Sequence, residues 1–192
     1  MLSTTELFVE HIISGILSVV WMMSFVFCLT GVDPGFFPAM REYWPFFALI
    51  TTAIAYPIGI MVDTVADIML ARQNGKIRAK YNLPESFSIL AMIYQWKDEN
   101  IKSYFTYNRF KTRVARSSMI NFLMIAIGGS TFVWCQGESI AVVQTEKISI
   151  IILFVFLVLS LSAYLLWRQI GNDVYQKASG LVGNLKSNVG RE

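Results

Sequence analysis

The chain has 192 residues, of which 55% are hydrophobic and 15% are charged, and its mean hydropathy is +0.51. Soluble domains typically carry about 25% charged residues, so this composition argues against an ordinary soluble protein and indicates a membrane protein. The formal net charge is only +3, but the positive charges are concentrated in one part of the chain.

Four apolar runs approach the ~20 residues that a helix needs to cross the hydrocarbon core of a bilayer. They occupy residues 11–30, 44–62, 117–134 and 148–167. Too little chain remains between them for an independent soluble domain. We therefore predict an all-α membrane protein with four transmembrane helices, forming a single membrane domain over residues 1–192.

The distribution of Lys and Arg predicts the orientation. Segment 71–116, between the second and third spans, holds ten Lys and Arg residues against three acidic ones, and the tail 168–192 holds four. Loops 31–43 and 135–147 hold one each. Because loops rich in Lys and Arg stay in the cytoplasm, we expect both termini and segment 71–116, hereafter the basic segment, on the cytoplasmic side of a bacterial inner membrane.

The first span has a polar edge. Glu10, Ser14, Ser18 and Trp21 follow one another at spacings of four, four and three residues, so they share one helical face. Small hydroxyl side chains let helices approach closely and form hydrogen bonds between them. We expect this face to pack against another helix, with a water-facing surface as the alternative.

Two cysteines, Cys28 and Cys135, both fall near the outer membrane boundary. A disulfide between them is one interpretation, because an oxidising compartment such as the periplasm permits it. The other interpretation is that they are two small buried hydrophobic residues.

The second span carries a polar stripe at spacings of four, three, four and four: Thr52, Tyr56, Gly59, Asp63 and Asp67. One interpretation is structural. The two carboxylates would pair with Arg113 and Arg116, which lie at the same depth at the start of the third span, because an unpaired buried carboxylate costs several kcal/mol. The other is that the stripe lines a conduction path and attracts cations.

Two helices are predicted within the basic segment, forming a cytoplasmic helical hairpin. Pro84 and Glu85 are typical of a helix start. An apolar stripe at helical spacing follows, formed by Ile89, Leu90, Ile93 and Trp96. A second helix is expected to begin near Ile101 and to run without a break into the third span.

Nine residues are candidates for binding lipid or a partner: Arg72, Lys76, Arg78, Lys80, Trp96, Arg109, Lys111, Arg113 and Arg116. Basic side chains mixed with aromatic ones can bind single-stranded nucleic acid. Attraction to anionic lipids of the inner leaflet contributes about 1 kcal/mol per Lys or Arg, and a segment tethered at the membrane meets lipid first. A cytoplasmic protein partner is compatible with either, and its binding could compete for Arg113 and Arg116 and so disturb the spans.

The last span is nearly featureless between residues 150 and 159, which is typical of a helix facing lipid. Apolar residues recur at near-helical spacing in the tail: Ile170, Val174, Ala178, then Leu181 or Val182, and Leu185. Two glycines, Gly180 and Gly183, weaken that helix. A short amphipathic segment at the inner surface and a frayed helix end are the two interpretations.

The inventory of catalytic groups is small. His11 is the one histidine, and the sequence has no HExxH helix, no Cys–His metal spacing and no Gly-x-Ser-x-Gly elbow. The spacing of Asp63 and Asp67 resembles the end of the metal motif in membrane CDP-alcohol phosphotransferases, but the preceding half of that motif is absent. We expect neither enzymatic activity nor a metal or cofactor.

In size, four-span layout and basic cytoplasmic hairpin, the chain resembles the small membrane components of bacterial anti-phage defence loci, in particular the membrane subunit of the Kiwa system. The resemblance covers the whole chain in outline and rests on no signature motif, so no residue roles are carried over. It implies a homo-oligomer, with a tetramer as one arrangement, that senses membrane disturbance and works with a cytoplasmic DNA-binding partner. The chain is also similar to ion-channel effectors of nucleotide-signalling defence systems, which implies a channel controlled by a ligand.

Overall fold

The computed structural model describes residues 4–31, 38, 41–84, 88, 89, 98–136 and 144–189, with side chains described between residues 8 and 183. Within these residues there are four long helices and no β-strand: α1 (Thr4–Thr30), α3 (Trp44–Lys80), α5 (Glu99–Gln136) and α6 (Thr145–Val189). Each is long and apolar enough to cross a membrane. The predicted all-α, four-span fold is confirmed, and the chain is a multi-pass membrane protein.

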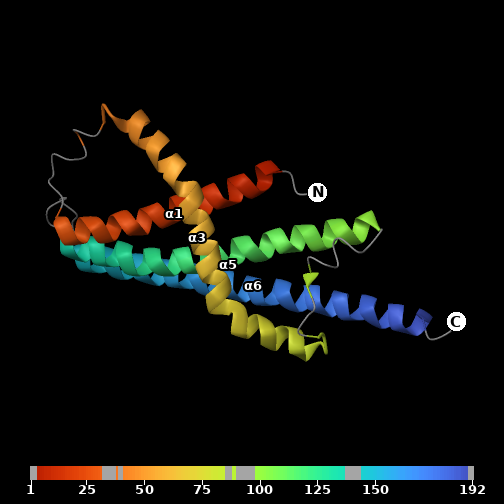
Figure 1. Ribbon diagram of the computed structural model, residues 1–192. Coiled ribbons are helices and arrows are strands. Elements are labelled where there is room, and N and C mark those ends of the chain that lie inside the picture. The colour runs from red at the N-terminus through yellow and green to blue at the C-terminus, as the bar shows by residue number, and fades with distance from the viewer. Residues whose placement is uncertain are drawn as a thin grey trace.

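Three helices lie side by side and the fourth crosses them. α1, α5 and α6 run along one another, while α3 crosses them steeply (Figure 1). α1 packs against α3 and α5, and α5 packs along α6. The start of α1 and the end of α6 lie at the same end of the bundle, together with the end of α3 and the start of α5 (Figure 1). We call this the basic end, and the opposite end the far end.

All four helices extend beyond their predicted spans at the basic end, and α1 does so by beginning at Thr4. α3 continues to Lys80 and α6 continues through Gly180 and Gly183. α5 begins at Glu99 and runs unbroken to Gln136, which confirms the helix predicted to start near Ile101. The other predicted helix of the hairpin lies mostly outside the described residues, and its residue Trp96 does so entirely.

Local sequence explains several helix ends. Gly31 has φ +78° and donates its N–H to the Phe27 carbonyl at 3.1 Å, which ends α1 in the left-handed conformation that glycine adopts without strain. Pro45 lies in the first turn of α3, where its missing N–H costs no hydrogen bond. α3 ends at Lys80 and is followed by Asn82 with φ 53°.

The middle of the bundle buries several polar side chains and exposes many apolar ones. Asn121 and Ser18 are fully buried, whereas large apolar side chains such as Phe154 (68% exposed) and Ile68 (71%) lie on the surface. In water this arrangement would expose apolar area at high cost, but in a bilayer the apolar side chains meet lipid tails. Most residues of 150–159 are exposed, as expected for the lipid-facing part of the last span.

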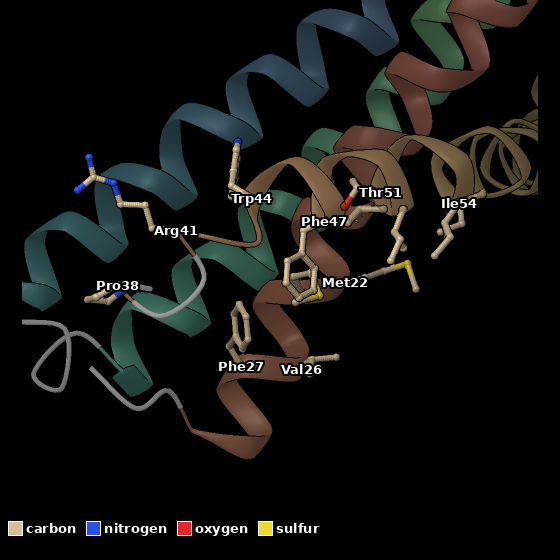
Figure 2. A pocket seen from close by; sticks show the side chains of 13 residues that line it. Met22, Val26, Phe27, Pro38, Arg41, Trp44, Phe47, Thr51 and Ile54 are labelled. Atoms are coloured by element: carbon tan, nitrogen blue, oxygen red, sulfur yellow. The ribbon is translucent and has the colours of Figure 1, made fainter. Parts of the chain in front are cut away.

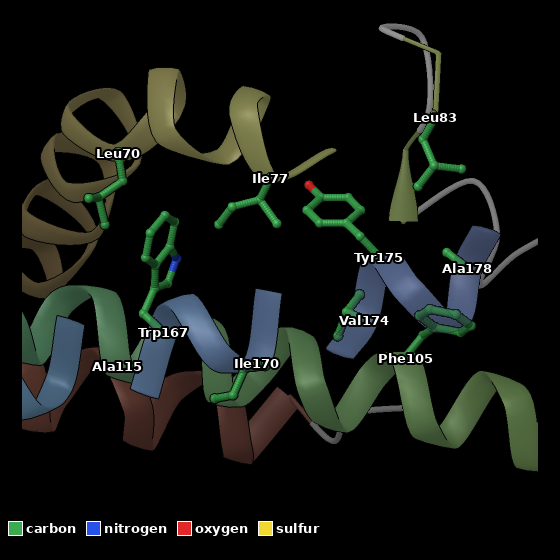
Figure 3. Close-up of a cluster of buried hydrophobic side chains, with 10 residues drawn as sticks. All are labelled: Leu70, Ile77, Leu83, Phe105, Ala115, Trp167, Ile170, Val174, Tyr175 and Ala178. Atoms are coloured by element: carbon green, nitrogen blue, oxygen red, sulfur yellow. The ribbon is translucent and has the colours of Figure 1, made fainter. Parts of the chain in front are cut away.

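At the basic end the extensions of α3, α5 and α6 share an apolar core (Figure 3). Its buried members are Leu70, Ile77, Leu83, Phe105, Ala115, Trp167, Ile170, Val174, Tyr175 and Ala178. The tail stripe of Ile170, Val174 and Ala178 therefore packs inside the protein. The tail is a helix because its apolar face is covered by α3 and α5, which outweighs the cost of its glycines.

Candidate functional site at the basic end

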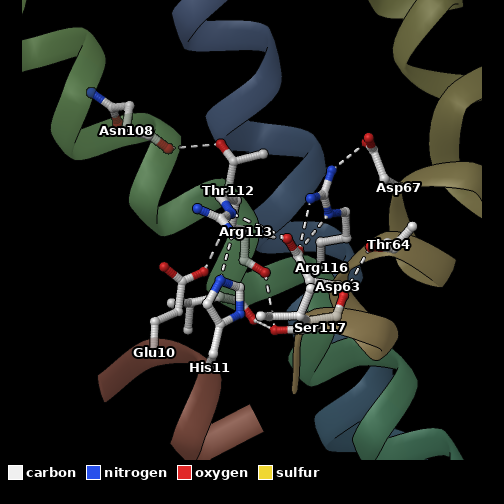
Figure 4. Close-up of polar contacts among 12 residues, drawn as sticks. Glu10, His11, Asp63, Thr64, Asp67, Asn108, Thr112, Arg113, Arg116 and Ser117 are labelled. Atoms are coloured by element: carbon white, nitrogen blue, oxygen red, sulfur yellow. Dashed lines mark hydrogen bonds and ion pairs between the residues drawn. The ribbon is translucent and has the colours of Figure 1, made fainter. Parts of the chain in front are cut away.

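A network of charged side chains joins α1, α3 and α5 near the basic end (Figure 4). Arg113 of α5 donates its Nε–H to Asp63 of α3 at 3.1 Å, and this Nε lies 3.6 Å from a Glu10 carboxylate oxygen of α1. Its terminal nitrogen lies 2.9 Å from Nε2 of His11. Because a guanidinium can only donate, Nε2 accepts, so His11 is neutral and carries its proton on Nδ1.

Arg116, one turn further along α5, binds both aspartates of α3. It donates to Asp63 at 3.2 Å from Nε and 2.7 Å from a terminal nitrogen, and it also pairs with Asp67. The pairing predicted for Asp63 and Asp67 is thus confirmed. Between them, the two arginines hold α3 against α5 through directional, charge-assisted hydrogen bonds.

The members of the network differ in burial. The side chains of Asp63 and Arg116 are 12% and 13% exposed, whereas that of Asp67 is 65% exposed. A buried ion pair adds little net stability relative to an apolar replacement, but removing one partner leaves a buried charge uncompensated. Asp67 is therefore the member of the network that is most open to water or a ligand.

Glu10 is incompletely satisfied. One of its carboxylate oxygens lies near Arg113, while the other, Oε2, is buried and has no hydrogen-bond partner among the described residues. An unsatisfied buried oxygen is costly, so the position of Glu10 lowers the net stability gained from its ion pair with Arg113.

Close backbone contact fixes the crossing of α1 and α3 beside this network. Gly15 of α1 lies against the Ala55 carbonyl, and Gly59 of α3 lies against the His11 carbonyl. A Cβ atom at either position would overlap the main chain of the facing helix. Two glycines, one on each helix, thereby bring Glu10 and His11 within reach of α3 and α5.

The predicted stripe of α3 divides between different environments. Gly59 and Asp63 are buried against α1 and α5. Tyr56 is half-buried, with its ring 4.9 Å from that of Phe8 and 5.9 Å from that of His11. Thr52 is exposed and donates to its own helix, to the Ala48 carbonyl, and Asp67 is largely exposed. The five residues do not form one common surface within a single chain.

The predicted lipid- or partner-binding residues also divide into two groups. Five are exposed at the basic end: Arg72, Lys76, Lys80, Arg109 and Lys111. Arg78, Arg113 and Arg116 are partly buried. Only the exposed group can form a platform, because the arginines of the network are already engaged with carboxylates.

The polar edge of α1 faces α5, where it meets a residue that the sequence reasoning missed. Asn121 accepts hydrogen bonds from Ser18 Oγ at 2.8 Å and Trp21 Nε1 at 3.1 Å, and it donates to the Ser14 carbonyl at 3.0 Å. The position of Asn121 within the third span could have indicated its role, since an amide inside a span needs hydrogen-bond partners on a neighbouring helix.

A cavity of about 570 Å³ opens beside the network, between α3, α5 and α6. Arg78, Arg109, Arg113 and Arg116 line it, together with Asp63 and Asp67. Tyr175 and Asn74 also contribute to its wall, and the Tyr175 hydroxyl donates to Asn74 Oδ1 at 3.0 Å. Burial raises the pKa of the Tyr175 phenol, so the hydroxyl stays protonated and acts as a donor.

A second cavity, of about 820 Å³, lies between α1 and the first half of α3 toward the far end (Figure 2). Its lining is almost entirely apolar, with Met22, Val26 and Phe47 among its residues and Arg41 as its one charged side chain. At the same end the thiols of Cys28 and Cys135 interact but are not joined in a disulfide. The described lining of this cavity is suited to apolar groups.

Among the residues that the structure describes, no group of three or more His, Cys, Asp or Glu side chains could hold a metal ion. The described side chains at the basic end can form ion pairs and can bind anions through guanidinium groups. No protein-family model, curated protein or solved structure matches this chain.

Proposed function

We propose that the protein is a non-enzymatic sensor or scaffold of a bacterial inner membrane, with its basic end in the cytoplasm. In this proposal it acts as a homo-oligomer in anti-phage defence. It recruits or controls a cytoplasmic partner through exposed basic residues, and it also contacts anionic lipids of the inner leaflet. Neither direct binding of nucleic acid nor catalysis is part of the proposal.

One observation carries it: Arg113 and Arg116 belong to the helix that emerges from the membrane, yet they bind carboxylates of α1 and α3. α5 is one continuous helix from Glu99 to Gln136. A force or ligand acting on its exposed part is transmitted to the spans without an intervening flexible joint. This coupling is what a sensor that reports between the membrane and the cytoplasm requires.

The test is recovery of cytoplasmic proteins with the tagged, detergent-extracted full chain. Arg72→Glu/Lys76→Glu/Lys80→Glu reverses exposed charges on α3 and leaves the ion-pair network intact. We expect partner recovery to fall at least tenfold, as about 1.4 kcal/mol of lost affinity gives. The control is Lys147→Glu, which reverses one exposed charge in the first turn of α6. α6 begins at the far end. Unchanged recovery in the triple variant, or an equal loss in the control, would contradict the platform.

The second candidate is an oligomeric, ligand-gated channel lined by α3. The exposure of Thr52 and Asp67 supports it, whereas Gly59 and Asp63 would lie behind such a lining because α1 and α5 cover them. Liposome flux decides between the two. A lining role predicts a cation-selective flux that weakens in Asp67→Asn, and a flux of unchanged size and selectivity in that variant would contradict this candidate.

A further inference from the structure

The polar cavity at the basic end carries more positive than negative charge. Four guanidinium groups and two carboxylates line it, so its walls have an excess of two formal positive charges. Counting Glu10, which approaches Arg113 from α1, the excess is one. A cavity with this balance attracts anions and disfavours cations.

Its arginines come from two opposing helices. Arg109, Arg113 and Arg116 follow one another at i, i+4 and i+7 along α5, and Arg78 belongs to α3. Planar guanidinium groups bind phosphate oxygens through two parallel N–H donors, which a lysine cannot do. Lys76 and Lys111 are close in sequence to these arginines, but both are exposed and neither lines the cavity.

The cavity is large enough for more than a bare ion. At about 570 Å³, it falls in the range of about 300–1,000 Å³ that small-molecule sites occupy. A ligand that has a body in addition to its anionic group therefore fits it. With the basic end in the cytoplasm, two sources of such a group are within reach: the headgroup of an anionic phospholipid of the inner leaflet and a soluble phosphorylated compound.

We propose that this cavity binds a phosphate-bearing ligand, with Arg78 and Arg109 as its main contacts and Arg116 as the residue that responds to it. Asp67 is the exposed partner of Arg116, and a phosphate in the cavity competes with it for that guanidinium. Occupancy then weakens one of the contacts that hold α3 against α5. The inference deepens the proposed function, on which it rests, by giving the coupling between α5 and the spans a ligand.

The test is binding by the purified full chain without any partner protein. Pyrophosphate is titrated at constant ionic strength in a neutral detergent, and the thermal unfolding midpoint is followed. In a separate arm the chain is placed in phosphatidylcholine nanodiscs with or without phosphatidylglycerol, and lipid retention is measured by native mass spectrometry. We expect saturable binding, at one molecule per chain, of pyrophosphate if the source is soluble and of phosphatidylglycerol if it is a lipid.

Two variants of equal charge separate the cavity from general surface charge. Arg78→Gln/Arg109→Gln should weaken binding of the active probe about tenfold or more, since hydrogen bonds to charged groups are each worth at least that factor. Lys102→Gln/Lys177→Gln removes the same charge at the same end but outside the cavity, and should bind as the wild type does. The single variant Arg109→Gln changes an exposed side chain and serves if the double variant does not fold.

Three results would overturn the inference: no saturable binding of either probe, wild-type affinity in the arginine variants, or equal losses in the lysine control. Its failure is distinguishable from failure of the proposed function. Partner recruitment is tested on Arg72, Lys76 and Lys80, none of which lines the cavity, so recruitment can persist when phosphate binding is absent.

Discussion

At the scale of single residues, two glycines bring the helices of the site together. Gly15 and Gly59 allow the main chains of α1 and α3 to touch, and this contact lies next to Glu10, His11 and Asp63. In a membrane, where lipid tails are as apolar as the helices, such close packing is a principal source of helix association. The absence of a side chain at these positions is therefore a structural requirement.

Replacing Gly59 by alanine should destabilise the fold by about 1–3 kcal/mol, the usual cost of overpacking, because the new Cβ overlaps the His11 carbonyl. Gly75 of the same helix is the matched control, since a Cβ there meets nothing within 4 Å. Gly75→Ala should be neutral or stabilising by up to about 1 kcal/mol, as expected for an open helical position. Unfolding in mixed detergent–SDS micelles measures the stability of both variants. Equal changes in stability for Gly59→Ala and Gly75→Ala would contradict the close contact of α1 and α3.

At the scale of helices, α5 is the element that organises the site. Its buried part bonds α1 through Asn121 and α6 through two serines: Ser149 donates to the Ser130 carbonyl and Ser160 to the Met119 carbonyl, both at 2.8 Å. Its extension carries Arg113 and Arg116 and contributes Phe105 to the apolar core at the basic end. A single rigid helix thus contacts every other described helix.

Asp63→Asn should lower stability by about 3 kcal/mol or more, because it leaves Arg113 and Arg116 in a partly buried site without their shared carboxylate. The control is Glu99→Gln, which removes the ion-pair partner of Lys102 on the same helix as the two arginines. That ion pair is largely exposed, since 83% of the Glu99 side chain is accessible. Its loss should cost below about 1 kcal/mol. Equal destabilisation by the two substitutions, in the same unfolding assay, would show that the network is not buried in solution.

At the scale of the whole molecule, the bundle has one charged and one apolar end. The arginine network, the exposed lysines and the apolar core of helix extensions all lie at the basic end, whereas the far end carries the apolar cavity and the two cysteines. Because Lys and Arg are retained on the cytoplasmic side, this asymmetry predicts the orientation of the whole chain.

Cysteine labelling in spheroplasts checks that orientation. On a Cys28→Ser/Cys135→Ser background, a membrane-impermeant maleimide should modify Lys147→Cys, at the far end, in intact spheroplasts. It should modify Lys177→Cys, at the basic end, only after lysis. The two labelled positions, Lys147 and Lys177, are both exposed, so a lack of labelling reports the side of the membrane. Labelling of Lys177→Cys in intact spheroplasts would reverse the predicted topology.

The sequence alone determined the features that depend on local composition and spacing. Runs of apolar residues defined the four spans, and Lys and Arg placement distinguished the two ends. The equal depth of the acidic residues of the second span and the arginines at the start of the third anticipated the pairing of Asp63 and Asp67 with Arg116. The continuation of α5 from the basic segment into its span was predictable for the same reason, because no helix-breaking residue interrupts it.

The tertiary structure decided which faces meet. From the sequence, the spacing of Ile170, Val174 and Ala178 predicted a tail helix only weakly. The sequence also did not indicate which residues Asn121 and Gly15 contact. Nor could it show that four arginines from two helices surround one cavity. Each of these features joins residues far apart in the chain, and its energy depends on how closely two backbones approach, which spacing along a single helix does not encode.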